Sequence, residues 1–329
     1  MGILLSLFFG FAPMFLFAAF VYWLDRYEKE PKLLLGVVFF WGAVIAAGAA
    51  FLINTVLGMG IYLFTGSETA TDLTTASLIA PIVEESFKGI AVLIVFLVFH
   101  SEFDSLLDGF VYAAVVALGF AATENAYYIY QYGFAEGGIS GLMGMVFVRV
   151  ILVGWQHPFY TAFTGVGLAL ARLNRSTLVK VIAPTAGWGL AVFTHSVHNT
   201  LASLLNGSEG LVFGTIVDWT GWFFMFLVIL WAIYRDKTAI RKYLQEEVSL
   251  GLITPLQYKT ACSAWAMNQA RLGALLSGHY RATDRFYQTC AELAHKKNQL
   301  SRIGDEKGNQ ATIERLRAEL GRLSIQAGN

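Results

Sequence analysis

The sequence predicts an all-α, polytopic membrane protein: a helical bundle of about seven spans with a C-terminal cytoplasmic helical domain. The chain has 329 residues, of which 56% are hydrophobic and only 14% charged, and its mean hydropathy is +0.56. This composition is too apolar for an ordinary soluble domain. Runs long enough to cross about 30 Å of hydrocarbon occur near residues 3–24, 33–57, 75–99, 106–130, 143–170, 179–204 and 211–233.

Charge divides the chain into two predicted domains, a membrane domain over residues 1–234 and a cytoplasmic helical tail over residues 235–329. The first holds 8 basic and 14 acidic residues, and the second holds 15 basic and 9 acidic residues. A basic tail suits the anionic cytoplasmic leaflet of the lipid bilayer. Because the basic residues alternate with acids and form no dense patch, we expect no nucleic-acid partner.

The loops predict the orientation. Basic residues are absent from the second, fourth and sixth loops and occur in the first loop, the fifth loop and the start of the tail, as Arg26, Lys29, Lys32, Arg172, Arg175, Lys180, Arg235 and Lys237. The positive-inside rule then places the N-terminus outside a cytoplasmic (inner) membrane and the tail in the cytoplasm. The first apolar run lacks a basic leading segment and a cleavage site, so we expect a span and not a signal peptide.

The tail reads as a series of helices. Thr254 to Gln257 form a capping-box start with proline at the first helical position. Gly278 is a plausible helix end, and amphipathic helices are expected over 284–302 and 311–326. Cys262 and Cys290 have no metal-ligand spacing and are expected to be free thiols in a reducing compartment.

The third predicted span carries two adjacent acids, Glu84 and Glu85, with Lys88 one turn later. A charge at the centre of a membrane helix costs roughly 2.5–3.5 kcal/mol on insertion scales. Glu84 and Lys88 share a helix face and could simply neutralise each other, but that leaves Glu85 directed at a different neighbour. The unpaired acid favours a functional site. Pro81 is expected to open the helix locally.

The fourth and fifth predicted spans add further polar groups. Phe120, Glu124 and Asn125 lie near the outer end of the fourth span, and His157 lies in the fifth span directly before a proline. Glu124 could instead extend its carboxylate to the outer interface, and a lone membrane histidine is often only a helix–helix hydrogen-bond donor. All these groups fall from mid-membrane outward, which favours one shared polar layer.

The sixth predicted span holds His195, His198 and Asn199. His195 and Asn199 share a face, whereas His198 points elsewhere. Two donors on one stripe suit an oxyanion hole, because charge that develops on a carbonyl oxygen must meet preorganised hydrogen bonds. The alternative is interhelical hydrogen bonding without chemistry.

The ordered motifs EExxK (Glu84 to Lys88), FxxxEN (Phe120 to Asn125), His157 and HxxxN (His195 to Asn199), with DRYEKEP after the first span, resemble the PrsW family of intramembrane proteases. That family is similar to the CAAX prenyl proteases and bacteriocin-processing enzymes, whose second motif typically ends in histidine where this chain has Glu124. The resemblance implies cleavage of a membrane-protein substrate, such as a single-span regulator of the anti-sigma-factor kind, near the extracytoplasmic face.

Two mechanisms are consistent with these residues. In the favoured one, Glu84 or Glu85 takes a proton from a water held with Glu124, and the water attacks the peptide carbonyl. His195 and Asn199 then stabilise the oxyanion, and His157 helps donate a proton to the leaving amine. In the alternative, zinc is the cofactor and is held by His157, His195 and Glu84 or Glu124.

Other classes of function remain open from the residues alone. A proton-coupled transporter also uses membrane glutamates and histidines as a relay. Such folds usually contain repeated halves with broken helices, and no corresponding EE or HxxxN pair recurs in two halves of the membrane domain. A non-catalytic receptor or scaffold would not need polar groups from four spans at one depth.

Overall fold

The computed structural model describes residues 1–205, 208–305 and 308–327, and within them every regular element is a helix, as predicted. The membrane part contains α1 (Gly2–Leu24), α2 (Lys32–Phe40), η1 (Trp41–Ala46), α3 (Ala47–Thr65), α4 (Glu68–Thr74), η2 (Thr75–Ile79), α5 (Ala80–Val98), η3 (His100–Glu102), α6 (Leu106–Tyr128), η4 (Ile129–Phe134), α7 (Ala135–Val146), η5 (Phe147–Leu152), α8 (Gln156–Arg172), α9 (Thr177–Leu204) and α10 (Ser208–Ser249). Helices α11 (Pro255–Ala261), α12 (Ala264–Leu276), α13 (Tyr280–Ile303) and α14 (Asn309–Gln326) follow.

Five segments of the described residues are long and apolar enough to cross a membrane: Gly2–Leu24, Lys32–Thr65, Leu106–Arg172, Thr177–Leu204 and Val212–Ser249. The protein is therefore an integral membrane protein. The sequence predicted seven spans, and two features explain the difference. Helix α5 is continuous but carries three charged residues, Glu84, Glu85 and Lys88, so it is less apolar than the five segments. The segment Leu106–Arg172 joins two of the predicted spans.

The segment Leu106–Arg172 doubles back inside α7. Gly138 has φ 58° and ψ −141°, a non-helical conformation that glycine adopts without steric penalty. The two arms pack tightly, since a Cβ on Gly141 would lie 2.3 Å from the carbonyl oxygen of Gly133. The chain therefore enters the bundle through α6 and returns through α8.

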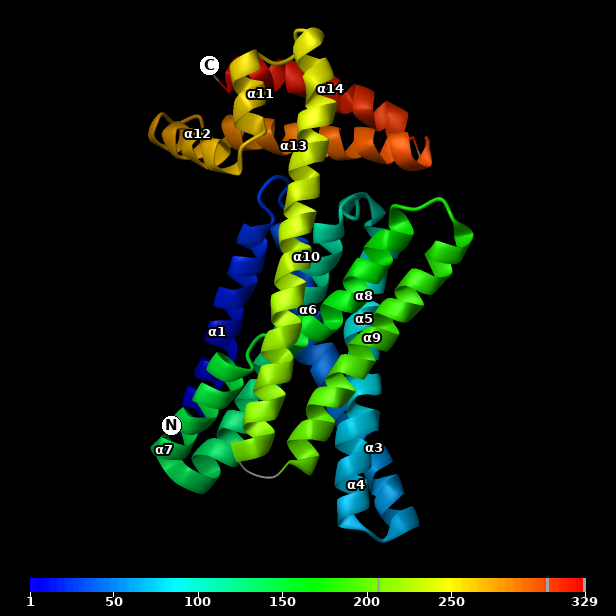
Figure 1. The fold of residues 1–329 in the computed structure, drawn as a ribbon. Helices are drawn as coiled ribbons and strands as arrows, with labels where there is room; N and C mark the ends of the chain where they lie inside the picture. The colour runs from blue at the N-terminus through cyan, green and yellow to red at the C-terminus, as the bar shows by residue number, and fades with distance from the viewer. Residues whose placement is uncertain (206–207, 306–307, 328–329) are drawn as a thin grey trace.

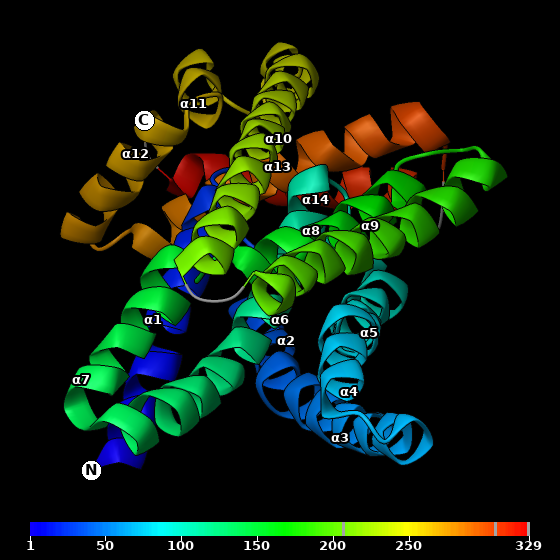
Figure 2. The ribbon, with the colours of Figure 1, turned by 60° about the horizontal axis from the view of Figure 1, so that its bottom comes forward.

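Helix α6 is the centre of the bundle, in contact with α1, α2, α5 and α8 (Figure 2). Nearly all its residues are buried, and small residues allow its neighbours to approach closely. A Cβ on Gly165 of α8 would lie 1.9 Å from the carbonyl oxygen of Gly109 in α6. Such contacts between small residues are typical of membrane helices, where close van der Waals packing replaces the hydrophobic effect.

Helix α10 connects the two parts of the molecule without a break. It runs along the bundle, and α11–α14 gather around its end, with α13 and α14 lying across its axis (Figure 1). These helices share a second hydrophobic core that includes Leu244, Phe286 and Leu316. The bundle has a hydrophobic core of its own, and the predicted boundary at 234/235 lies inside α10.

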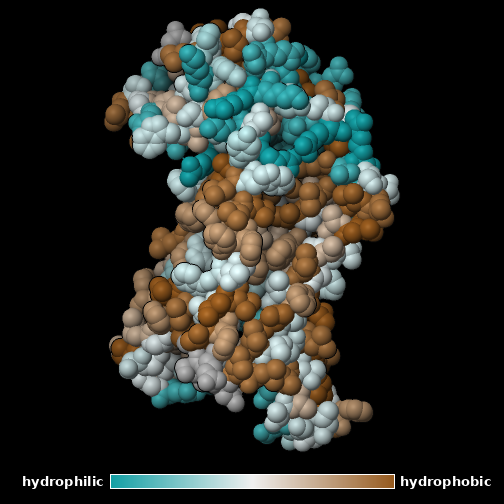
Figure 3. Space-filling model, in the orientation of Figure 1, coloured by the Kyte–Doolittle hydropathy of each residue, from teal (hydrophilic) through white to brown (hydrophobic). Residues whose placement is uncertain are grey.

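The surface shows the same division. On the face shown in Figure 3, apolar residues cover much of the bundle and hydrophilic residues cover much of the C-terminal helices. The predicted capping box from Thr254 to Gln257 is present, and Gly278 (φ 79°) follows the end of α12. Cys262 and Cys290 are both buried and unbonded, as predicted.

Candidate active site

Four helices bring the predicted polar residues to one place inside the bundle. Glu84, Glu85 and Lys88 come from α5, Glu124 from α6, His157 from α8 and His195 from α9. Glu124 lies 18 residues beyond Leu106, the end of α6 nearest the C-terminal helices. At 1.5 Å per residue that is about 27 Å along the axis. The cluster therefore lies in the half of the bundle that is farther from the C-terminal helices.

The start of α5 is shaped by Pro81. The preceding turn, η2, is a π turn that ends directly before α5, whose second residue is this proline. Proline has no N–H to donate, and π turns are frequent at functional sites. The expected local opening of the helix is therefore present. On the other side, Trp41 Nε1 donates a hydrogen bond to the carbonyl oxygen of Phe87 at 3.0 Å and fixes α5 against η1.

Lys88 lies at the centre of the cluster and is completely buried. The sequence paired it with Glu84, but its Nζ lies 2.7 Å from Glu85 Oε1 and 3.7 Å from Glu84 Oε2. Glu84 and Glu85 precede Lys88 by four and three residues, so both fall on its helix face. The shorter distance makes Glu85 its main partner. The ammonium also lies 4.1 Å from the centroid of the Phe120 ring, a cation–π contact.

Glu85 is fully buried and accepts hydrogen bonds from three directions. Besides Lys88, Thr161 Oγ1 donates to its Oε2 at 2.8 Å, and His195 Nδ1 lies 3.0 Å from its Oε1. An ionised carboxylate only accepts, so Nδ1 of His195 is the protonated nitrogen and Nε2 is free to accept or to bind a ligand. Glu85 therefore orients His195.

Glu124 belongs to a second half of the cluster. Its Oε2 lies 2.8 Å from His157 Nε2 and also receives the guanidinium of Arg149, so it does not extend alone to the interface. His157 Nδ1 lies 3.2 Å from Lys88 Nζ. His157 therefore carries its proton on Nε2 and accepts from the lysine at Nδ1, which joins the two halves. Arg149 of η5 is the cation of this half.

Glu84 is the acid without a direct hydrogen-bond partner. Its Oε2 is buried and makes no hydrogen bond to the described residues, although it lies 3.9 Å from His195 Nε2. One ligand atom each from Glu84, His157 and His195 lies within 4.8 Å of the other two. Two histidines and a carboxylate are a donor set of catalytic zinc sites, and the orphaned oxygen fits such an ion. These residues could therefore hold a metal.

A further acid, Asp218 of α10, was missed from the sequence. Its Oδ1 accepts a hydrogen bond from Tyr160 Oη at 2.8 Å, and its Oδ2 lies 2.8 Å from His198 Nδ1. The Tyr160 ring stacks on the ring of His195 with 4.8 Å between centroids. Asp218 thus holds Tyr160 and His198, and through the Tyr160 ring it helps to position His195. The signal was present, since this is a single carboxylate within the apolar seventh predicted span.

The two predicted asparagines lie at the edge of the cluster. Asn199 Nδ2 donates to the carbonyl oxygen of Ala76 at 2.9 Å, which anchors α9 to η2. This geometry does not support the expected oxyanion donor, because the amide is directed to the backbone and away from His195. Asn125 Oδ1 accepts from Arg149 Nε at 3.0 Å and so helps hold that guanidinium against Glu124.

Comparisons with known proteins identify the family of the chain. A family model described as PrsW family intramembrane metalloprotease matches residues 30–233. The chain is 27% identical over 222 residues to Protease PrsW of Bacillus subtilis (strain 168), covering 68% of this chain and 88% of that protein. It is 33% identical over 156 residues to Protease PrsW of Geobacillus kaustophilus (strain HTA426), covering 47% and 62% of the two chains. No solved structure matches. The chain therefore belongs to the PrsW family of intramembrane metalloproteases and is a peptidase.

Proposed function

We propose that the protein hydrolyses a peptide bond of a membrane-spanning substrate, such as a single-span regulator, near the extracytoplasmic side of the cytoplasmic membrane. The main support is the buried Oε2 of Glu84, an acceptor without a hydrogen-bond partner in the described residues, within a polar cluster of an otherwise apolar bundle. From the loop charges we infer that the C-terminal helices lie in the cytoplasm. The cluster, in the opposite half of the bundle, then faces the extracytoplasmic side.

Glu84 is the proposed base. Its unpaired oxygen can accept a hydrogen bond from a water and take a proton as the oxygen of that water attacks the substrate carbonyl. Glu85 is unsuited to this step, because Lys88, Thr161 and His195 already occupy its oxygens. Its proposed task is to hold Lys88 and His195 in place.

Lys88 and His157 are proposed to stabilise the charge that develops as the peptide bond is cleaved. Lys88 Nζ, 2.7 Å from Glu85 and 3.7 Å from Glu84, is a fixed positive charge beside the reacting atoms. His157, whose Nε2 lies 2.8 Å from Glu124 Oε2, is the proposed donor of a proton to the leaving amine. Glu124 stays ionised beside Arg149 and orients His157. The proton that Glu84 takes from the water replaces the one that His157 gives up, since the two side chains lie within 4.8 Å of each other.

The family description implies a metal, and zinc is the proposed identity. Glu84, His157 and His195 are the residues that would hold it. When bound there, zinc would acidify a water and polarise the carbonyl group. Glu85 would orient His195 toward the ion. Glu124 would do the same for His157, whose Nδ1 would bind the ion in place of its hydrogen bond from Lys88, so that a carboxylate lies behind each histidine ligand.

The decisive experiment replaces Glu84 with Gln and identifies membrane proteins that accumulate at full length in cells. Glu84→Gln keeps the size of the side chain and removes the charge, so we expect intact folding and cleavage lowered at least 100-fold, the scale of general-base catalysis. Glu136→Gln, an exposed acid of α7, is the matched control and should cleave normally. Cleavage by Glu84→Gln at the control rate would contradict the proposal.

A further inference from the structure

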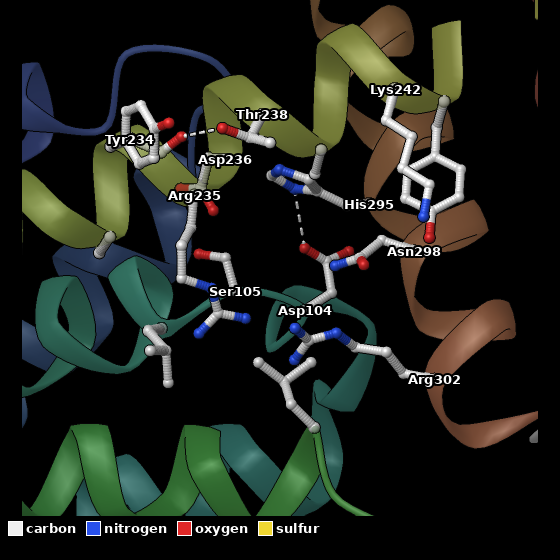
Figure 4. Close-up of a pocket in the computed structure, with 15 residues that line it drawn as sticks. Asp104, Ser105, Tyr234, Arg235, Asp236, Thr238, Lys242, His295, Asn298 and Arg302 are labelled. Carbon is white, nitrogen blue, oxygen red and sulfur yellow. Dashed lines mark hydrogen bonds and ion pairs between the residues drawn. The ribbon is translucent and has the colours of Figure 1, made fainter.

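A pocket of about 250 Å³ lies where the bundle meets the C-terminal helices, and we call it the boundary pocket. Its walls come from α10, α13 and the turn before α6 (Figure 4). At this level the apolar surface of the bundle gives way to the hydrophilic surface of the C-terminal helices (Figure 3). The exposed Tyr234 of α10 lines the pocket, and the exposed Trp231 lies against Arg235, another lining residue. Tryptophan and tyrosine at such a level are typical of the headgroup region of a bilayer.

Three basic side chains of the boundary pocket have no acidic partner. Arg235, Lys242 and Arg302 form no ion pair with any described residue. Arg235 and Arg302 reach in from opposite sides, α10 and α13, and are close enough to repel each other (Figure 4). Two guanidinium groups that converge without a carboxylate between them are suited to bind an anion between them.

A buried histidine adds a fourth donor. His295 lines the pocket and is 3% exposed, and its Nε2 has no hydrogen-bond partner among the described residues. Its Nδ1 lies 2.6 Å from Glu28 Oε2 and 3.1 Å from Asp104 Oδ1. Burial lowers the pKa of His295, but these two carboxylates outweigh it and raise the pKa well above its usual value. The imidazole is therefore protonated, and Nε2 is an unsatisfied N–H donor.

The acids of the pocket do not cancel these charges. Asp104 is already neutralised, since Lys296 Nζ lies 2.9 Å from its Oδ2 and His295 lies on its other oxygen. Asp236 is the remaining carboxylate, against three unpaired cations. The pocket as a whole is positive and rich in donors, with apolar contacts from Leu106, Leu173 and Ala232.

We propose that the boundary pocket binds the phosphate group of an anionic phospholipid. Arg235, Arg302 and His295 would contact the phosphate, and the apolar residues would face the start of the acyl chains. Paired arginines match phosphate oxygens, and basic pockets at this level of a membrane protein bind acidic headgroups. Because its walls come from both parts of the chain, the bound lipid would tie the C-terminal helices to the bundle. The proposal is independent of the peptidase chemistry.

The test uses the full-length protein, purified in detergent and stripped of lipid. It is titrated with phosphatidylglycerol and with phosphatidylcholine of the same chain length, and binding is followed by native mass spectrometry. Inorganic phosphate is added as a competitor in a separate series. We expect preferential, saturable binding of phosphatidylglycerol, weakened about fivefold by Arg302→Gln and by Arg235→Gln, from the usual contribution of one basic residue near a membrane.

Two variants control the test. Arg302→Lys keeps the charge and should retain most of the binding, and Arg322→Gln removes an exposed arginine of α14 outside the pocket and should have no effect. If Arg235→Gln unfolds, the test rests on Arg302→Gln, because Arg302 is exposed and its replacement should leave the fold intact. Equal binding of both lipids, or Arg302→Gln behaving like Arg322→Gln, would overturn the proposal. Displacement of the lipid by equimolar inorganic phosphate would show that the pocket binds a soluble anion and would overturn the proposal of a lipid ligand.

Discussion

Replacing Lys88 with Met tests whether a single buried ammonium holds the acidic cluster together. Its Nζ lies 2.7 Å from Glu85 Oε1 and 3.7 Å from Glu84 Oε2. At an effective dielectric constant of about 20, these distances correspond to attractions of about 6 and about 4.5 kcal/mol before desolvation is subtracted. Removing one partner of a buried ion pair costs about 3–5 kcal/mol, because a charge is left buried without compensation. We expect Lys88→Met to lower the free energy of unfolding by this amount.

A second variant isolates the pair. Adding Glu85→Gln to Lys88→Met removes the uncompensated charge, so the double variant should be more stable than the sum of the two single losses. Unfolding is followed by denaturant titration in one detergent, with Lys180→Met, an exposed lysine of α9, as the control. If Lys88→Met unfolds with the control, or if the two losses add, the ammonium does not organise the cluster.

Three further predictions concern packing, support of the site and the contact with the tail. Gly165→Ala, whose new Cβ would lie 1.9 Å from a backbone oxygen of α6, should lower the free energy of unfolding by about 1–3 kcal/mol. Gly189→Ala, with open space around it, is the control and should not lower it. Thermal unfolding measures the difference. Asp218→Asn should lower substrate cleavage about 10–100-fold with the fold intact, as seen for groups behind catalytic ligands, and cleavage at the wild-type rate would refute this support. His295→Gln should destabilise the protein most below about pH 6.5, and the difference from wild type should shrink as pH rises through the raised pKa of His295, measured by unfolding across pH. A difference that grows with pH would contradict it.

The positions of the site could be predicted because membrane spans make polar residues conspicuous. Glu84, Glu124, His157 and His195 stand out against apolar neighbours, and helical rise alone assigns them a common depth. The choice of partner could not be predicted. The i+3 and i+4 positions are both within reach of Lys88, and only the packing of α9 and α8 against α5 gives Glu85 its additional partners His195 and Thr161.

Other features depended on long-range contacts. Arg149 could extend to the interface by sequence, but α6 places Glu124 and Asn125 beside it. Asn199 shares a helix face with His195, yet η2 presents the backbone oxygen of Ala76 to its amide. That oxygen is left available because the N–H of Ala80 bonds to Thr75 and the next residue, Pro81, has no N–H. The reversal at Gly138 also has no strong signal, since glycine is common in membrane helices.

The charges of the cluster connect the two mechanisms. The carboxylates of Glu84, Glu85 and Glu124 face Lys88 and Arg149, which leaves a net charge of −1 when both histidines are neutral. A buried net charge is unfavourable, so the cluster should hold one additional positive charge, either a proton or a metal ion. Zinc binding should then release about one proton into a weakly buffered solution, because ligands must be deprotonated. Glu84→Gln should abolish both zinc retention and proton release. Full zinc retention by this variant would show that Glu84 is not a ligand and would leave it as the base.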